Sequence, residues 1–476
     1  MHKQLNVLFI SLTALVFSFL LIPNIFQEGL FMDGLIYSTT GLNLAKGTGT
    51  FWNLSFTKTI ISNFDGHPPL AMYLQSIFFK LFGDSHSIEK FYSFITAVIT
   101  AILMISTWNF FHQGKSTKQL SWLPVLLWIT IPVCFWSYQN NVLENTMGVF
   151  TLAAVLISIY ALNKDGLLKY ILLLFPALFM VLGFLTKGFP AFFPLAVFGL
   201  HFIVYQKKSL AETFINTVFV FLVSAFILFL VFYDDSARAF ITNYINVQVL
   251  SSLKGNLVVD PRTFVVVRLL RELMAPFFLM LLIFLIAFLV NRKENTVFTL
   301  IKKENVKDSL FLILIGLSAS MPIMISPKQM GFYLLPAIPF FVLAFSVIIA
   351  PLIINTCSKK ISSGFYYANY TFFLFALISI SIYTKHNSVN PTRDKELLAD
   401  VKTLSNYLEK GTTIGVSPPL FANWSLIGYL QRYYFINMED ANAQKYILTD
   451  KNSPLEKENY QLELETTGLL LYVNQD

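Results

Sequence analysis

The sequence predicts an α-helical polytopic membrane protein, with about 11 transmembrane helices, interfacial helices in its first outer loop and a small α/β domain at the C-terminal end. Composition is the first observation behind this prediction. Hydrophobic residues make up 55% of the 476 residues and charged residues only 13%, against about 25% charged in ordinary soluble domains. Because Phe contributes 49 residues and Cys only two, the chain is not disordered, collagen-like or a disulfide-built module.

The second observation is a series of long apolar runs. A membrane core about 30 Å thick requires roughly 20 apolar residues per helix. We expect the first run to remain as a helix, because it exceeds the ~7–15 apolar residues of a signal peptide. Eleven stretches lack Asp, Glu, Lys and Arg over at least 17 residues: 4–27, 91–114, 119–143, 145–163, 170–186, 188–206, 213–233, 273–290, 309–327, 329–358 and 361–384.

Basic residues predict which loops face the cytoplasm. Lys and Arg occur in every second loop, starting at Lys3, and cytoplasmic loops are enriched in these residues. We therefore expect a cell-membrane protein with a cytoplasmic N-terminus and with 28–90, 234–272 and 385–476 outside. Residues 1–384 are then a transmembrane domain and 385–476 an extracytoplasmic domain. These loops account for the net charge of +7, and no basic block with interleaved aromatic residues predicts a nucleic-acid partner.

The C-terminal domain is expected to combine one helix with several strands. Segment 393–410 is amphipathic, because five apolar residues recur at helical spacing on one face. Those residues are Leu397, Leu398, Val401, Leu404 and Leu408. Strand-like runs follow at 412–416, 427–436, 444–449 and 468–473. We interpret the segment as a small α/β domain.

Polar residues that could take part in catalysis or binding collect at the outer ends of the spans. The spans themselves hold almost no ionisable residue at mid-depth, where an ion-coupled transporter usually carries one. The sequence also lacks both glycine-rich motifs that bind nucleotide phosphates. These features predict chemistry at the outer face of the membrane, on an activated substrate that arrives through the lipid.

The first outer loop contains two candidate sites. Asp33 follows the first span, where it could act as a general base or cap the helix expected at 34–45; the residues alone favour the cap. His67 lies in Asp65-Gly66-His67-Pro68-Pro69, and the two prolines predict a helix over 70–82. A solvated histidine and a substrate ligand fit this motif equally well.

Asp33, Asp65 and His67 could supply oxygen and nitrogen ligands to a divalent cation. Their spacing does not decide the point, so a metal is left open and no other cofactor is predicted.

Charged residues also occur in the short outer connections. Glu144 begins the fourth span and Lys187 ends the fifth. A carboxylate at a helix N-terminus and a lysine before a C-terminal glycine are ordinary caps. Lys187 is also well placed to hold a lipid phosphate, because it is the only charged residue in a very short connection.

Further candidates flank the last outer connections. Ser326-Pro327-Lys328 precedes Tyr333, which is either a site residue or a member of the interfacial aromatic belt. Arg268 and Arg271 are three residues apart and share a helical face. These arginines either contact the substrate or anchor an interfacial helix to anionic lipid headgroups.

Taken together, these motifs resemble the glycosyltransferase C-fold superfamily, in particular the branch of protein O-mannosyltransferases and bacterial aminoarabinose and other lipid-linked-sugar transferases. The resemblance covers residues 1 to about 350. It rests on the order, spacing and common outer location of Asp33, His67-Pro68-Pro69-Leu70, Leu81-Phe82-Gly83, Glu144, Thr186-Lys187-Gly188 and Tyr333-Leu334-Leu335-Pro336 with Pro339.

The resemblance implies transfer of a sugar from a polyprenyl phosphate to an extracytoplasmic acceptor hydroxyl on a protein, lipid or glycan, usually with inversion. It implies that Asp33 is the general base. Many members have Asp-Glu at this point, whereas Gly34 follows Asp33 here, and Lys90 stands where an Arg is common. A phosphate leaving group needs cations rather than a proton donor, whereas a glycosidase needs two facing carboxylates.

On this hypothesis, Asp65, His67, Glu144 and Tyr333 bind sugar or acceptor, and Lys187, Lys328, Arg268 and Arg271 are candidate contacts to the lipid phosphate. Three alternatives stay open: a transporter or flippase of lipid-linked glycans, a polysaccharide ligase or polymerase of the same fold, and an inactive scaffold. The residues do not identify the sugar or the acceptor.

Overall fold

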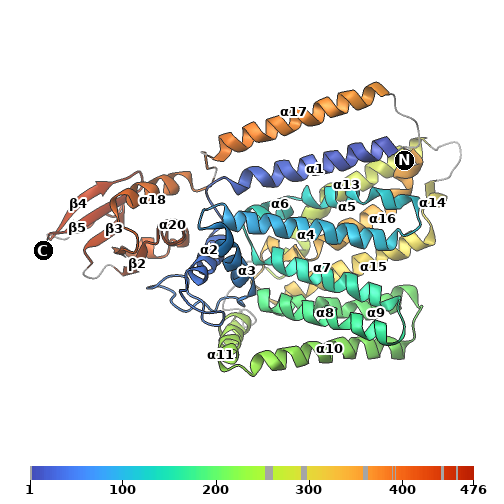
Figure 1. Ribbon diagram of the computed structural model, residues 1–476, viewed down its shortest axis with the longest axis horizontal. Coiled ribbons are helices and arrows are strands. Elements are labelled where there is room, and N and C mark those ends of the chain that lie inside the picture. Colours follow the sequence, from blue (N-terminus) through green and yellow to red (C-terminus); the bar gives the residue numbers. More distant parts are fainter. Residues whose placement is uncertain are drawn as a thin grey trace.

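The computed structural model shows a long helical bundle with a small sheet domain at one end (Figure 1). The chain is a multi-span membrane protein, as the apolar runs predict. The structure describes residues 3–251, 261–290, 297–356, 363–388, 390–391, 393–440, 444–456 and 459–475.

Apolar helices form the bundle. Within the described residues, eight helices are long and apolar enough to cross a membrane. The bent pair Ser116–Ile129 and Pro132–Gln139 makes a ninth if it counts as one span. The predicted number of eleven is therefore not confirmed. The eight are α1 (Lys3–Ile25), α4 (Ile88–Phe111), α7 (Leu143–Leu162), α8 (Gly166–Lys187), α10 (Leu210–Phe232), α13 (Phe264–Val290), α15 (Lys303–Ser320) with η4 (Met321–Ile325), and α16 (Ile338–Thr356).

Of the three remaining predicted runs, two form shorter or broken elements and the third, 361–384, corresponds to the long helix α17. The run 119–143 bends by 76° before α6, because Pro132 cannot continue the preceding helix. The run 188–206 consists of a 3₁₀ segment and a short helix. These elements are η1 (Ser116–Leu120), α5 (Trp122–Ile129), α6 (Pro132–Gln139), η2 (Phe189–Leu195), α9 (Ala196–Tyr205), α14 (Val297–Leu300) and α17 (Ser363–Ser388).

Several helices begin earlier than the charge-free runs predict, and α4 and α13 are two examples. Helix α4 includes Glu89 and Lys90, both buried, and α13 includes Arg268, Arg271 and Glu272. The prediction stopped each span at its first charged residue. Glu89 pairs with Arg432, and Arg268 pairs with Glu272. Pairing compensates these charges and allows the helices to continue through them.

Helices α2 (Met32–Ala45) and α3 (Leu70–Phe82) lie across the sheet-bearing end of the bundle (Figure 1). Both were predicted, and α3 begins directly after Pro68-Pro69 because proline is tolerated only at the start of a helix. Helix α11 (Asp235–Tyr244), the π-helical η3 (Ile245–Leu250) and η5 (Gly331–Leu334) lie within connections of the same end.

The C-terminal domain has a five-stranded sheet in the order β2-β1-β3-β5-β4. Strand β1 pairs in parallel with β2 and β3, whereas β5 is antiparallel to β3 and β4. The predicted boundary at residue 385 falls near the end of α17 and remains a prediction. The elements are α18 (Lys395–Tyr407), β1 (Thr413–Val416), α19 (Pro418–Phe421), α20 (Trp424–Tyr434), β2 (Asn437–Asp440), β3 (Tyr446–Asp450), β4 (Tyr460–Glu465) and β5 (Leu469–Asn474).

The strand predicted at 427–436 is wrong, because this segment is mostly helix α20. The side chain of Asn423, the N-cap residue of α20, accepts a hydrogen bond of 3.0 Å from the Leu426 N–H. Ile427 and Leu430 then lie in the core of the sheet domain. The apolar pattern suggested a strand because large apolar and aromatic residues lie on several faces of this helix. Its residues from Leu426 to Arg432 are all buried, so no polar face marks a helical period.

Helix α20 attaches the sheet domain to α2. Gly428 packs on Leu35 so closely that a β-carbon would lie 3.0 Å from that side chain. The Tyr429 hydroxyl accepts a hydrogen bond of 3.0 Å from the Leu30 N–H and donates one of 2.7 Å to Asp394. The C-terminal domain therefore packs directly on the helix that carries Asp33.

A buried ion pair strengthens the same attachment. Arg432 on α20 lies 2.6 Å from the Glu89 carboxylate on α4, and the two side chains are 1% and 0% exposed. Arg432 also donates hydrogen bonds to the carbonyl oxygens of Asp84 and Ser85.

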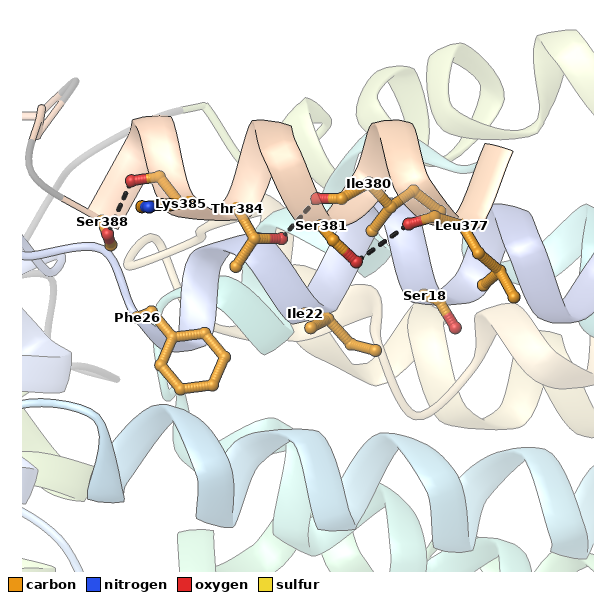
Figure 2. Close-up of a pocket in the computed structure, with 9 residues that line it drawn as sticks. All are labelled: Ser18, Ile22, Phe26, Leu377, Ile380, Ser381, Thr384, Lys385 and Ser388. Carbon is orange, nitrogen blue, oxygen red and sulfur yellow. Dashed lines mark hydrogen bonds between the residues drawn. The ribbon is translucent and has the colours of Figure 1, made fainter. Parts of the chain in front are cut away.

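A groove separates α1 from α17 along the side of the bundle (Figure 2). Two of its hydroxyl groups are satisfied within α17: Ser381 donates to the Leu377 carbonyl and Thr384 to the Ile380 carbonyl. The lining also includes Ser18, several apolar side chains and one basic residue, Lys385.

Replacing Arg432 by Leu should destabilise the protein by about 3–5 kcal/mol, because Glu89 would remain buried without its cation. Thermal unfolding of the purified protein and protease release of the C-terminal domain measure this. Lys46→Ala is the control, since it breaks an exposed pair with Asp84 that contributes at most about 1 kcal/mol. Equal stability of the two variants would contradict the importance of the buried pair.

Candidate active site

Asp33 lies in the first turn of α2 and is not its cap. The N-cap is Phe31, and no side chain caps this helix end. The Phe31 N–H instead donates to the Asn140 side chain at 2.9 Å. The capping interpretation of Asp33 is therefore wrong, and its carboxylate is available for other contacts.

Gly34 allows α2 to pack against the turn after α6. A β-carbon at Gly34 would lie only 2.2 Å from the Asn140 carbonyl oxygen. A larger residue, such as the Glu that many relatives were expected to carry here, would displace one of these two backbones. Close packing thus explains the residue that follows Asp33.

Lys187 and Glu144 form a buried ion pair between α8 and α7. The Lys187 Nζ lies 3.1 Å from the Glu144 Oε1, and the two side chains are 9% and 1% exposed. Neither residue caps its helix through its side chain: Val142 is the N-cap of α7, and α8 ends at Gly188, whose φ of 91° favours glycine. The pair therefore joins the two helices at the sheet-bearing end.

Aromatic rings surround the Lys187 ammonium group. Its Nζ lies 5.3 Å from the ring centre of Tyr333 and 6.0 Å from that of Tyr37, a favourable cation–π arrangement. The Tyr244 hydroxyl of α11 donates a 3.3 Å hydrogen bond to the Lys187 carbonyl oxygen. A β-carbon at Gly188 would lie 2.2 Å from that hydroxyl, so the glycine permits this contact.

His67 joins the same group from the loop before α3. Its Nε2 lies 3.4 Å from the Lys187 Nζ, and its ring packs edge-on against Tyr37 with centroids 5.7 Å apart. The Nδ1 atom is buried and has no hydrogen-bond partner among the described residues. Burial, together with the nearby Lys187 and Lys328, holds the pKa of His67 well below its usual range. His67 is therefore neutral at physiological pH.

The charges in this region act on one another. Burial raises the pKa of Asp33 above its ordinary 3.8, and Lys187 and Lys328 oppose that shift. Burial lowers the pKa of Lys328, with Lys187 acting in the same direction and Asp33 against it. The Asp33 carboxylate thus lies in a partly desolvated setting near two cations, where charged groups interact more strongly than in water.

We define the Asp33 cluster as the eight residues that these contacts and electrostatic interactions connect. The sequence suggested six of them but missed Tyr37 and Tyr244. Tyr37 stands four residues after Asp33 and therefore shares its helical face, a signal that could have been used. Tyr244 carried no comparable signal. The cluster comprises Asp33, Tyr37, His67, Glu144, Lys187, Tyr244, Lys328 and Tyr333.

Three other candidates lie apart from the contacts that define the cluster. Asp65 accepts a hydrogen bond from Asn243 beside a separate cavity. Arg268 turns toward Glu272, one helical turn later, at 2.5 Å, and Arg271 is exposed on α13. The described residues contain no group of three or more His, Cys, Asp or Glu side chains that could hold a metal ion, so Asp33, Asp65 and His67 do not assemble into one.

The whole bundle and its sheet domain match known structures. ArnT from Cupriavidus metallidurans bound to undecaprenyl phosphate matches with a TM-score of 0.62 at 12% identity, over 100% of this chain and 98% of ArnT. The apo form of ArnT gives 0.65 at 11% identity, over 98% and 97%. The chain has the glycosyltransferase C fold. This confirms the resemblance that the sequence motifs indicated.

Other comparisons agree with this fold. The oligosaccharyltransferase of Archaeoglobus fulgidus in its apo form matches with a TM-score of 0.54 at 13% identity, over 94% of this chain and 70% of that chain. A family model described as dolichyl-phosphate-mannose-protein mannosyltransferase matches residues 66–233, a range that includes His67, Glu144 and Lys187. No curated protein matches the chain.

Replacing Lys187 by Met should lower the thermal midpoint, because Glu144 would keep a buried carboxylate without its partner, at a cost of about 3–5 kcal/mol. Adding Glu144→Gln in the same chain should restore part of the loss, since the unpaired charge is then removed. Thermal unfolding in detergent measures both. A double variant less stable than Lys187→Met would contradict the pairing.

Proposed function

We propose that the protein is a membrane glycosyltransferase that moves a sugar from a polyprenyl-phosphate donor to an acceptor hydroxyl outside the cytoplasm. One observation carries the proposal: a partly desolvated carboxylate, Asp33, shares one cluster with the cations Lys187 and Lys328. This combination suits a reaction in which an acceptor loses a proton while a phosphate departs.

The comparisons support the proposed donor. One matching ArnT structure is bound to undecaprenyl phosphate. The Archaeoglobus fulgidus oligosaccharyltransferase AglB was solved in complex with a dolichol-phosphate and an inhibitory peptide. It matches with a TM-score of 0.50 at 12% identity, over 94% of this chain and 69% of AglB. The matched mannosyltransferase family is also named for a dolichyl-phosphate sugar. A polyprenyl phosphate is common to these descriptions, and it supports a polyprenyl-phosphate sugar as the donor proposed here.

In the proposed reaction, the Asp33 carboxylate takes the proton of the acceptor hydroxyl. The acceptor oxygen attacks the anomeric carbon of the sugar, and the bond from that carbon to the phosphate oxygen breaks. The electron pair leaves with the lipid phosphate, whose negative charge Lys187 and Lys328 stabilise. Attack opposite the departing phosphate inverts the anomeric configuration.

The other residues of the Asp33 cluster have supporting roles in this proposal. Glu144 holds Lys187 in place through their ion pair. Because Nε2 of the neutral His67 accepts from the Lys187 ammonium group, its buried, unpartnered Nδ1 carries the proton and can donate a hydrogen bond to substrate. Tyr37 and Tyr333 flank the lysine with aromatic surface. Arg268 and Arg271 remain candidate contacts to the lipid phosphate outside the Asp33 cluster.

Replacing Asp33 by Asn should reduce kcat by about 10²–10⁴-fold, the contribution of a general base, while raising the thermal midpoint. The raised pKa means that the folded protein disfavours the ionised carboxylate at neutral pH, and the amide removes that cost. Transfer from a polyprenyl-phosphate sugar to acceptor, followed by mass spectrometry of the product, measures the rate. Unchanged transfer would exclude Asp33 as the base.

The rate should fall as the pH is lowered through the raised pKa of Asp33, because only the ionised carboxylate accepts a proton. The acid limb of the kcat/KM profile should therefore lie above the ordinary value of 3.8. Lys328→Met should shift this limb to higher pH, since Lys328 lowers the pKa of Asp33. The exposed-residue variant Lys46→Ala should leave the limb in place. A shift to lower pH in Lys328→Met would contradict the assignment.

A further inference from the structure

A second cavity, of about 330 Å³, lies between the first outer loop and α11. The loop contributes Trp52, Asn53, Asn63 and Asp65, and α11 contributes Phe240 and Asn243. The volume falls within the range of small-molecule sites. The contacts that join the Asp33 cluster include none of these six residues.

Aromatic rings form the apolar part of this cavity. The rings of Trp52 and Phe240 lie 6.0 Å apart at an angle of 54°. Phe240 is buried, whereas Trp52 is half-buried and therefore presents part of its indole surface. A large aromatic surface at the wall of an open cavity can stack against the C–H face of a flat, partly apolar ligand.

Side-chain amides form the polar part. Asn53, Asn63 and Asn243 are exposed, and each amide offers both a donor and an acceptor. Asp65 is the one charged residue among those that line the described cavity, and its carboxylate accepts a hydrogen bond from Asn243. This lining suits an uncharged ligand with many hydroxyl groups and disfavours a phosphate, because no cation is present in it.

The cavity is a direct neighbour of the Asp33 cluster. Asp65 stands two residues before His67, and Asn243 directly precedes Tyr244. The Asp65–Asn243 hydrogen bond therefore links the loop that carries His67 to the helix that carries Tyr244. A ligand in the cavity would therefore contact residues that adjoin His67 and Tyr244 in the chain.

We propose that this cavity binds a neutral sugar ring, stacked on Trp52 and hydrogen-bonded by Asn53, Asn63 and Asn243. The sugar belongs either to the donor or to a glycan acceptor, which share this chemistry. The inference deepens the proposed function and rests on it for the reaction. On this proposal, the lysines of the Asp33 cluster bind the charged phosphate. The aromatic and amide side chains of the cavity bind the neutral sugar ring.

Binding is tested directly on the full-length protein in lipid nanodiscs. Saturation-transfer NMR with neutral methyl glycosides of mannose, glucose and N-acetylglucosamine should show at least one binder. Trp52→Ala and Asn243→Ala should each weaken it about tenfold, as loss of a central contact does. Tyr407→Ala, an exposed aromatic of the C-terminal domain, should bind like the unmodified protein, and so should Asp33→Asn.

Three binding results would overturn the proposal. The first is the absence of any glycoside signal from the unmodified protein at millimolar concentration, and the second is equal signals from it and both cavity variants. The third is a signal from short Ser/Thr peptides that Trp52→Ala removes while no glycoside binds, because the cavity would then be a peptide site.

Transfer kinetics distinguish the source of the sugar. If the cavity holds the donor sugar, Trp52→Ala and Asn243→Ala should raise the KM for the lipid-linked donor; if it holds a glycan acceptor, they should raise the KM for that acceptor. Unchanged KM values for both donor and acceptor would overturn this inference and leave the proposed function standing. Unchanged transfer by Asp33→Asn would instead remove the proposed base and leave the binding result standing.

Discussion

The ion pair between Glu144 and Lys187 is the interaction on which the candidate site depends. Both side chains are almost fully buried, and an isolated charge in such a place would be strongly destabilising. Pairing compensates the burial of both groups and holds the Lys187 side chain at the end of α8. Once held there, the lysine contacts His67 and the rings of Tyr37 and Tyr333. Residues from five separate parts of the chain thus meet around one ammonium group.

Asp33 reaches this group through the packing of α2 on both sides. Gly34 lets the helix approach the backbone at Asn140, and Gly428 lets α20 approach Leu35 from the sheet domain. The Arg432–Glu89 pair and the Tyr429 hydrogen bonds hold α20 in place. The C-terminal domain therefore supports the helix that carries Asp33. Burial raises the pKa of Asp33, and shifted pKa values of this kind are common among residues of functional sites.

The candidate site was only partly predictable from the sequence. Asp33, His67, Glu144, Lys187, Lys328 and Tyr333 were singled out by their common position at the outer ends of spans, and the structure brings these six together. Asp65, Arg268 and Arg271 satisfied the same criterion but make other contacts. Position along the chain says at which depth a side chain lies, whereas its direction around the helix axis depends on which neighbour it packs against.

The sequence by itself determined that the chain is a helical membrane protein, because apolar runs and sparse charges leave few other structures that satisfy every backbone group in lipid. It also determined the starts of helices such as α3, where Pro68-Pro69 leaves no alternative. Tertiary structure alone decided that α4 and α13 extend through charged residues, that 427–436 is mainly helix, and that Tyr37 and Tyr244 join the site. The physical reason is that these outcomes depend on partners distant in the chain: Glu89 can be buried only because Arg432, 343 residues later, is beside it.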